Sequence, residues 1–157
     1  MIPDEIAPLK GLALAASNGH LDQVIRLLQT GHDVHETNDR ALRFACLSGQ
    51  TDVAKALLER GANVHAKQDS CLIGACSRGD EKMVGLLIQF GADVTSNHSY
   101  ALYRASENGH ANIVRTLLEN GAGNVSPEPY RDYVLRAARK NGHKSVLEVL
   151  SEFGFVE

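Results

Sequence analysis

Histidine and cysteine are the residue types in this chain best suited to bind a transition metal ion, and cysteine could also supply a nucleophile. The 157 residues include seven histidines and three cysteines. His35 and His65 hold equivalent places in neighbouring sequence units, which would put them about 10 Å apart, too far to share a metal ion. Cys46, Cys71 and Cys76 form no Cys-x-x-Cys pair and have no recurring histidine or acidic partner. We therefore expect no metal site and no catalytic nucleophile.

The glycines do not form a phosphate-binding loop. The sequence contains no Walker loop and no dinucleotide-binding glycine pattern, and it also lacks His-Glu-x-x-His and Gly-x-Ser-x-Gly. The sequence therefore predicts that the chain is not an enzyme and binds no cofactor.

A basic cluster near the C-terminus is the one concentration of charge that could contact an anionic partner. It consists of Arg131, Arg136, Arg139, Lys140 and Lys144. The whole chain has 16 lysines and arginines against 19 acidic residues, for a formal net charge of -3, so we do not expect nucleic-acid binding. The cluster also fits the polar outer face of a terminal repeat. A nucleic-acid or anionic-ligand binder that uses this cluster is the alternative function.

The elements that would position these residues follow from internal repeats. Two glycine series and one leucine series recur at a fixed interval of about 30 residues through four units, and a fifth unit follows after a slightly longer interval. The leucines are Leu12, Leu42, Leu72, Leu102 and Leu135. The first glycines are Gly19, Gly49, Gly79, Gly109 and Gly142, and the second glycines are Gly31, Gly61, Gly91, Gly121 and Gly154.

Each unit predicts two short helices. Leu42, Ala45 and Cys46 are spaced i, i+3 and i+4, which is one stripe of a helix, and a glycine in the left-handed conformation would end it. A second helix then fills the chain up to the next glycine. We interpret the cysteines as small buried residues, and His20, His110 and His143 as hydrogen-bonding groups at the start of the second helix. The polar links, such as residues 61–70, predict short extended fingers.

These residues carry a family resemblance. The strings LALAASNGH, LRFACLSGQ and LYRASENGH, and the endings LLERGANVHA and LLIQFGADVT, resemble ankyrin repeats over about residues 10–154. The resemblance implies an all-α solenoid of five helical hairpins with short finger loops. It also implies a non-catalytic protein–protein interaction module, an adaptor or inhibitor, that binds its partner protein on a concave face.

The chain departs from the usual repeat in one consistent way. The family repeat has about 33 residues and opens its first helix with Thr-Pro-Leu-His. Here four units are shorter, with about 30 residues each, and lack the Thr-Pro pair, so the fingers should be short. Such 30-residue units resemble the variant found in large DNA viruses and some bacteria.

We predict one domain over residues 1–157. Residues 1–10 would form an N-terminal cap, with Ile2, Ile6 and Leu9 on one stripe. At the other end, Leu147, Leu150 and Phe153 would pack inward while Arg139 faces water. The repeats would cover about residues 11–39, 40–69, 70–99, 100–132 and 133–157.

The partner-binding residues are predicted from their register in the first helices. The first and fifth positions after the repeated leucine point away from the stack, and their side chains differ between units. With the nearby finger ends, the predicted partner-binding residues are Arg40, Arg43, Leu47, Ile73, Arg78, Tyr100, Tyr103 and Glu107. Tyr103 and Arg43 would be the anchor residues, because tyrosine and arginine are enriched in binding hot spots.

Composition also predicts the setting of the chain. The cysteine count is odd, the N-terminus is acidic, and no apolar run approaches the roughly 20 residues of a membrane helix. We expect an intracellular, cytoplasmic monomer that has no contact with membranes. A passive spacer or self-associating unit is the structural alternative, and light scattering at two concentrations would detect self-association.

Overall fold

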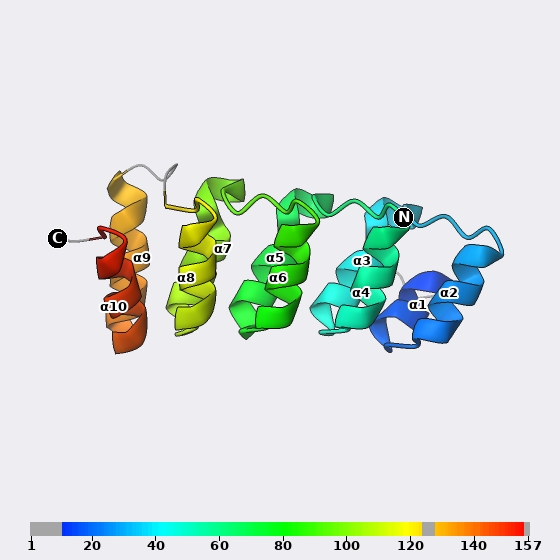
Figure 1. The fold of residues 1–157 in the computed structure, drawn as a ribbon, viewed down its shortest axis with the longest axis horizontal. Helices are drawn as coiled ribbons and strands as arrows, with labels where there is room; N and C mark the ends of the chain where they lie inside the picture. Colours follow the sequence, from blue (N-terminus) through cyan, green and yellow to red (C-terminus); the bar gives the residue numbers. More distant parts are fainter. Residues whose placement is uncertain (1–10, 124–127, 156–157) are drawn as a thin grey trace, which may run out of the picture. The chain divides into compact units, whose positions relative to one another are not determined.

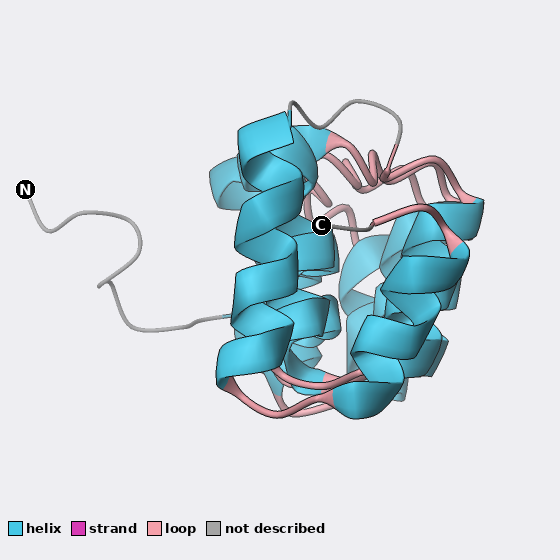
Figure 2. Ribbon diagram, turned by 90° about the vertical axis from the view of Figure 1, so that its left-hand side faces the viewer, coloured by secondary structure: helices cyan, strands magenta, loops and turns pink. Residues whose placement is uncertain are grey.

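The computed structural model describes residues 11–123 and 128–155, and within these ranges it contains ten α-helices and no strand (Figures 1 and 2). This confirms the all-α prediction. The chain divides into two compact units, residues 1–71 and 72–157. The predicted cap at residues 1–10 lies outside the described residues, so it stays a prediction, as does the single domain.

The first unit consists of two antiparallel helical hairpins and the beginning of a third. Helix α1 packs on α2 and α3, α3 packs on α4, and α2 packs on α4. The helices are α1 (Gly11–Ser17), α2 (Leu21–Gln29), α3 (Glu36–Leu47) and α4 (Thr51–Glu59), and α5 (Ala66–Arg78) crosses into the second unit. Leu12 and Leu42 are buried, as the repeat pattern predicts.

The second unit repeats this arrangement. Helix α7 packs on α8 and α9, and α10 packs on α8 and α9. The helices are α6 (Glu81–Gln89), α7 (Ser96–Glu107), α8 (Ala111–Glu119), α9 (Glu128–Lys140) and α10 (Lys144–Glu152). Leu72, Leu102 and Leu135 are at most 5% exposed. Burying a leucine side chain stabilises a fold by about 1.5–3 kcal/mol, so this repeated position forms a large part of the core.

The small residues of the first helices let neighbouring backbones approach closely. Ala45, Ala75 and Ala105 are fully buried, and Cys46 and Cys76 follow the first two of them in the chain and are buried as well. Burial raises the pKa of the Cys76 thiol to about 12. The interpretation of these cysteines as small buried residues is confirmed.

The links between repeats differ from the extended fingers that the sequence predicts. Inside the stated bounds of α3, Thr37, Asn38 and Asp39 all have φ between 52° and 56°, so they form a left-handed turn before the right-handed part of the helix. The same conformation recurs at 67–69 and 97–99, with no glycine in any of the three turns. Each such residue costs about 1–2 kcal/mol relative to the right-handed conformation. The left-handed turns therefore require compensating interactions.

Those interactions come from the last residue of each turn, which is buried. The Asp39 carboxylate accepts a hydrogen bond from the Asn63 backbone N–H at 2.8 Å and lies 3.0 Å from His35 Nδ1. In the second unit, Ser99 Oγ donates to the Ala122 carbonyl and the Tyr130 hydroxyl donates to the Ser99 carbonyl, both at 2.7 Å. In both units, residues of the following repeat thus bond to the last residue of the turn.

The C-terminal hairpin has the predicted polar outer residue and one unpredicted core residue. Arg139 is exposed and Leu150 is buried, as expected, whereas Leu147 and Phe153 are only half-buried. The aromatic ring that is fully buried is Phe155, and the Arg131 guanidinium carbon lies 4.7 Å from the centre of that ring.

Candidate functional site

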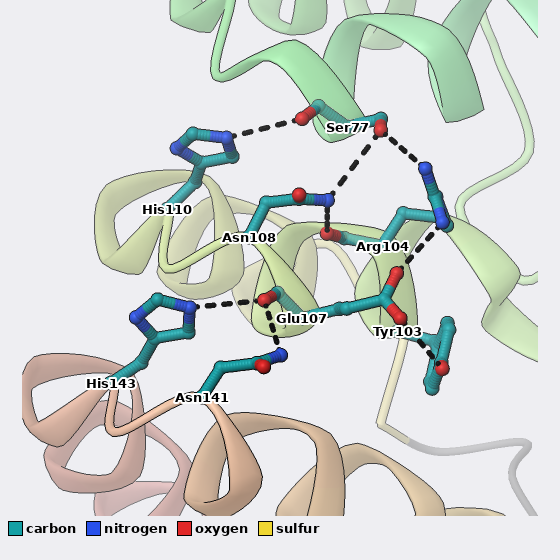
Figure 3. A network of polar contacts seen from close by, with 8 residues as sticks. All are labelled: Ser77, Tyr103, Arg104, Glu107, Asn108, His110, Asn141 and His143. Carbon is teal, nitrogen blue, oxygen red and sulfur yellow. Dashed lines mark hydrogen bonds and ion pairs between the residues drawn. The ribbon is translucent and has the colours of Figure 1, made fainter.

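A polar network covers the accessible side of helix α7 in the second unit (Figure 3). The Tyr103 hydroxyl donates to Glu107 Oε1 at 3.0 Å, and Arg104 Nη1 donates to Glu107 Oε2 at 2.7 Å. Arg104 Nη2 also donates to Ser77 Oγ at 2.8 Å. The Tyr103 ring stacks on the Tyr100 ring with 5.6 Å between centroids and 12° between planes. The network therefore holds the Tyr103 side chain in one orientation.

The network shifts the titration of the Tyr103 phenol to higher pH. Its hydrogen bond to Glu107, followed by burial and the charge of that carboxylate, raises the pKa of Tyr103 above its ordinary value. Burial likewise raises the pKa of Tyr130. Both phenols donate hydrogen bonds, Tyr103 to Glu107 and Tyr130 to the Ser99 carbonyl.

Two histidines link successive repeats, and this corrects the expected role of these residues. His110 Nε2 lies 3.2 Å from the Ser77 carbonyl oxygen, and His143 Nε2 lies 3.0 Å from the Glu107 carbonyl oxygen. A carbonyl can only accept a hydrogen bond, so Nε2 carries the proton in both rings. Neither ring caps its own second helix. The sequence prediction missed that both partners belong to the preceding repeat.

The first glycines of the third and fourth repeats make room for these two rings. A Cβ atom built on Gly79 would lie 2.6 Å from the His110 ring, and one on Gly109 would lie 2.6 Å from the His143 ring. Both glycines also have a positive φ. Glycine is therefore required at these positions for two independent reasons, conformation and contact.

The predicted partner-binding residues fall into one set on each first helix. Helix α3 carries Arg40, Arg43 and Leu47, α5 carries Ile73 and Arg78, and α7 carries Tyr100, Tyr103 and Glu107. Leu47, Arg78 and Tyr100 are exposed, whereas Arg43, Ile73, Tyr103 and Glu107 are half-buried. The structure brings Tyr100, Tyr103 and Glu107 into one network.

Arg40 is the member of the predicted set that differs from expectation. Only 8% of Arg40 is exposed, and its guanidinium carbon lies 5.4 Å from the centre of the Phe44 ring. This packing leaves Arg40 little surface with which to contact a partner. The sequence analysis placed Arg40 at the end of an extended finger, and it did not predict that the left-handed turn would bring Arg40 against the helix.

Sequence reasoning missed Tyr133, which is 60% exposed. It lies on α9 at the place that Tyr100 holds on α7, one repeat earlier. Counting back two positions from Leu135, as from Leu102 to Tyr100, identifies it. On the same helix, Arg136 and Lys140 are exposed, and Arg136 lies 3.5 Å from the exposed Asp132 carboxylate.

Comparison with known protein families supports the assignment of sequence repeats. A family model described as ankyrin repeats, in three copies, matches residues 9–68 and 65–128, more than half of the chain. No curated protein matches the chain. In the described ranges, no three His, Cys, Asp or Glu side chains are grouped so that they could hold one metal ion. No helix in the part of the chain that the structure describes has the length and apolar character needed to cross a membrane.

Proposed function

The chain belongs to the ankyrin-repeat family, and from this premise we propose that it is a non-catalytic module that binds a partner protein as an adaptor or inhibitor. Ankyrin repeats are generally protein–protein interaction modules. The partner would contact the surface formed by the turns and the accessible side of the first helix of each repeat, which is the concave face in this family.

One observation carries this proposal, the contrast between buried and accessible positions of the first helices. Ala45, Ala75 and Ala105 hold equivalent places, are identical and are fully buried. Two residues before each alanine stand Arg43, Ile73 and Tyr103, which are unalike and partly accessible. Core packing determines the first set and leaves the second free to vary. A surface that varies on an unchanged core suits recognition of a specific partner.

The geometry of Tyr103 supports its role as an anchor residue. Glu107 and Tyr100 hold the ring in place before any partner binds. Binding then costs little side-chain entropy, which for a rotamer-rich side chain is about 0.5–1.5 kcal/mol. Arg43 is the corresponding anchor residue in the first unit. Arg40 contributes little because it is buried.

The setting proposed from the sequence is a monomer in the cytoplasm. The odd number of cysteines and the lack of a Cys-x-x-Cys pair in the sequence support a reducing compartment. A net charge of -3 argues against nucleic acid as the main partner. A steep loss of nucleic-acid affinity with added salt would favour the alternative function instead.

The experiment begins with capture of the partner and reconstitution from purified proteins. Tyr103→Ala or Arg43→Ala should then weaken binding by at least about 2 kcal/mol, with nearly the same melting temperature. Lys82→Ala is the matched control, because Lys82 is exposed on the second helix α6. If both anchor changes leave affinity intact while changes on second helices reduce it, the partner does not use this face.

A further inference from the structure

The exposed side of helix α9 presents aromatic and basic side chains together. Tyr133, Arg136 and Lys140 are spaced i, i+3 and i+7, which places them along one side of the helix. Tyr133 is 60% exposed and the Arg136 side chain is 74% exposed. Tyr100, at the place equivalent to Tyr133 on the adjacent helix α7, is 39% exposed. We call these four residues the tyrosine–arginine patch.

The cations of this patch are available to an outside partner. Arg136 pairs with Asp132 at 3.5 Å, and both side chains are mostly exposed, so water screens the pair. Lys140 forms no ion pair with any residue that the structure describes. In contrast, Arg115 on α8 donates two hydrogen bonds to the Glu152 carboxylate, at 2.6 and 3.0 Å. Of these three cations, the two on α9 can therefore attract an outside anion.

Exposure of Tyr133 is the second observation. A tyrosine with 60% of its surface in water gains little from folding. Tyrosine and arginine are enriched at the centres of protein interfaces, where one aromatic ring can bury about 150–250 Å². The patch thus combines an apolar surface with cations suited to carboxylates.

We propose that the tyrosine–arginine patch binds an acidic segment of a partner protein. Carboxylates of that segment would pair with Arg136 and Lys140, and an apolar or aromatic side chain would pack against Tyr133 and Tyr100. This inference rests on the proposed function and names the chemistry of the partner. The Asp132 carboxylate beside Arg136 interrupts the positive surface, which disfavours a continuous phosphate backbone.

The spacing of the helices restricts the segment further. Packed helices lie about 8–10 Å apart, and an extended chain advances about 3.3 Å per residue. A partner chain crossing from α9 to α7 therefore covers the distance in about three residues. The bound segment should have its acidic residues about three positions from its apolar residue.

Selection from a phage library of random 12-residue peptides tests the proposal on the full chain. The enriched peptides should contain an excess of Asp and Glu, and a synthetic fluorescent copy of the strongest one serves as the probe in anisotropy titrations. The double variant Arg136→Gln/Lys140→Gln should weaken probe binding at least about tenfold, and Tyr133→Ala should do so as well. Lys82→Gln, which removes an exposed lysine of α6, should leave affinity within about twofold.

Several results would overturn the proposal. One is a selection that enriches no peptide, or peptides without an excess of Asp and Glu. Another is probe affinity that is unchanged in the Arg136→Gln/Lys140→Gln and Tyr133→Ala variants. A third is a loss of probe affinity in Lys82→Gln as large as in those variants. A 12-nucleotide oligothymidylate that binds as tightly as the peptide and is lost with the same variant would identify a nucleic-acid site instead. Circular dichroism melting confirms that each variant is folded. The affinity of the captured partner for Tyr103→Ala and Arg43→Ala chains tests the proposed function separately, so the two can fail independently.

Discussion

Substitution of Gly79 by alanine tests whether the His110 ring couples successive repeats. The added methyl group would lie 2.6 Å from the His110 ring, at a backbone position with a φ of +79°. Gly91 is the matched control, because its φ is +88° but no atom lies within 4 Å of an added Cβ. Both substitutions therefore place alanine at a positive φ, but only Gly79→Ala brings a methyl group against the His110 ring.

The magnitudes follow from these two terms. Alanine in the left-handed region costs about 1–2 kcal/mol, and reduced freedom of the unfolded chain returns about 0.4–1 kcal/mol. Gly91→Ala should therefore lower the free energy of unfolding by about 1 kcal/mol. Gly79→Ala has the same conformational cost, and it should lower the free energy of unfolding by about 1–3 kcal/mol more than Gly91→Ala does. The reason is that the His110 ring must move and loses its hydrogen bond to the Ser77 carbonyl.

Urea unfolding followed by circular dichroism at 222 nm measures both free energies, and a double-mutant cycle isolates the contact. In a His110→Ala background, Gly79→Ala should cost only about 1 kcal/mol, as Gly91→Ala does. Equal costs for Gly79→Ala and Gly91→Ala in the natural background would refute the reasoning. So would a Gly79→Ala cost that is unchanged when His110 is absent.

Three further predictions concern the core and the C-terminal hairpin. Leu72→Ala should lower the free energy of unfolding by about 2–5 kcal/mol, measured by urea unfolding, because Leu72 is almost fully buried. Cys46, Cys71 and Cys76 should react slowly with a thiol reagent in the native chain and rapidly after denaturation, since all three are buried; a disulfide in fresh protein would contradict this. Deleting residues 130–157 should expose apolar surface of α7 and α8 and promote aggregation, detected by light scattering. A monomeric 1–129 fragment of undiminished stability would show that the last hairpin is not a cap.

The helices could be predicted because their signal repeats. Leu12, Leu42 and Leu72 are equally spaced along the chain, and each begins the same apolar stripe. An ambiguous helix assignment in one unit can therefore be resolved by comparison with the other units. All are buried in the structure. The left-handed turns gave no such signal, because they contain Thr, Asn, Asp and similar residues and no glycine. Their conformation depends on hydrogen bonds to residues much later in the chain, such as Asn63. The conformational propensities of the turn residues themselves give no information about such distant bonds.

The candidate site could be predicted only by register. The sequence predicted which side of each first helix is accessible, and Leu47 on that side is exposed, as is Tyr100, which was predicted from its place at a finger end. It did not show that Arg40 packs over Phe44, since that contact depends on how the turn joins the helix. Tyr133 was missed because the fifth unit was interpreted as a cap with a basic outer face, although Leu135 places Tyr133 in the same register as Tyr100.

The bond between the Asp39 carboxylate and the Asn63 backbone N–H determines when part of the chain can fold during synthesis. The two residues are 24 positions apart, and ribosomes add about 5–20 residues per second, so Asn63 emerges about 1–5 s after Asp39. A short helix forms in about 0.1–1 μs. Helix formation is therefore much faster than the arrival of Asn63, and a nascent chain would carry one unfinished left-handed turn near its growing end. Translation speed, and not the conformational search, would set the rate at which each turn is completed.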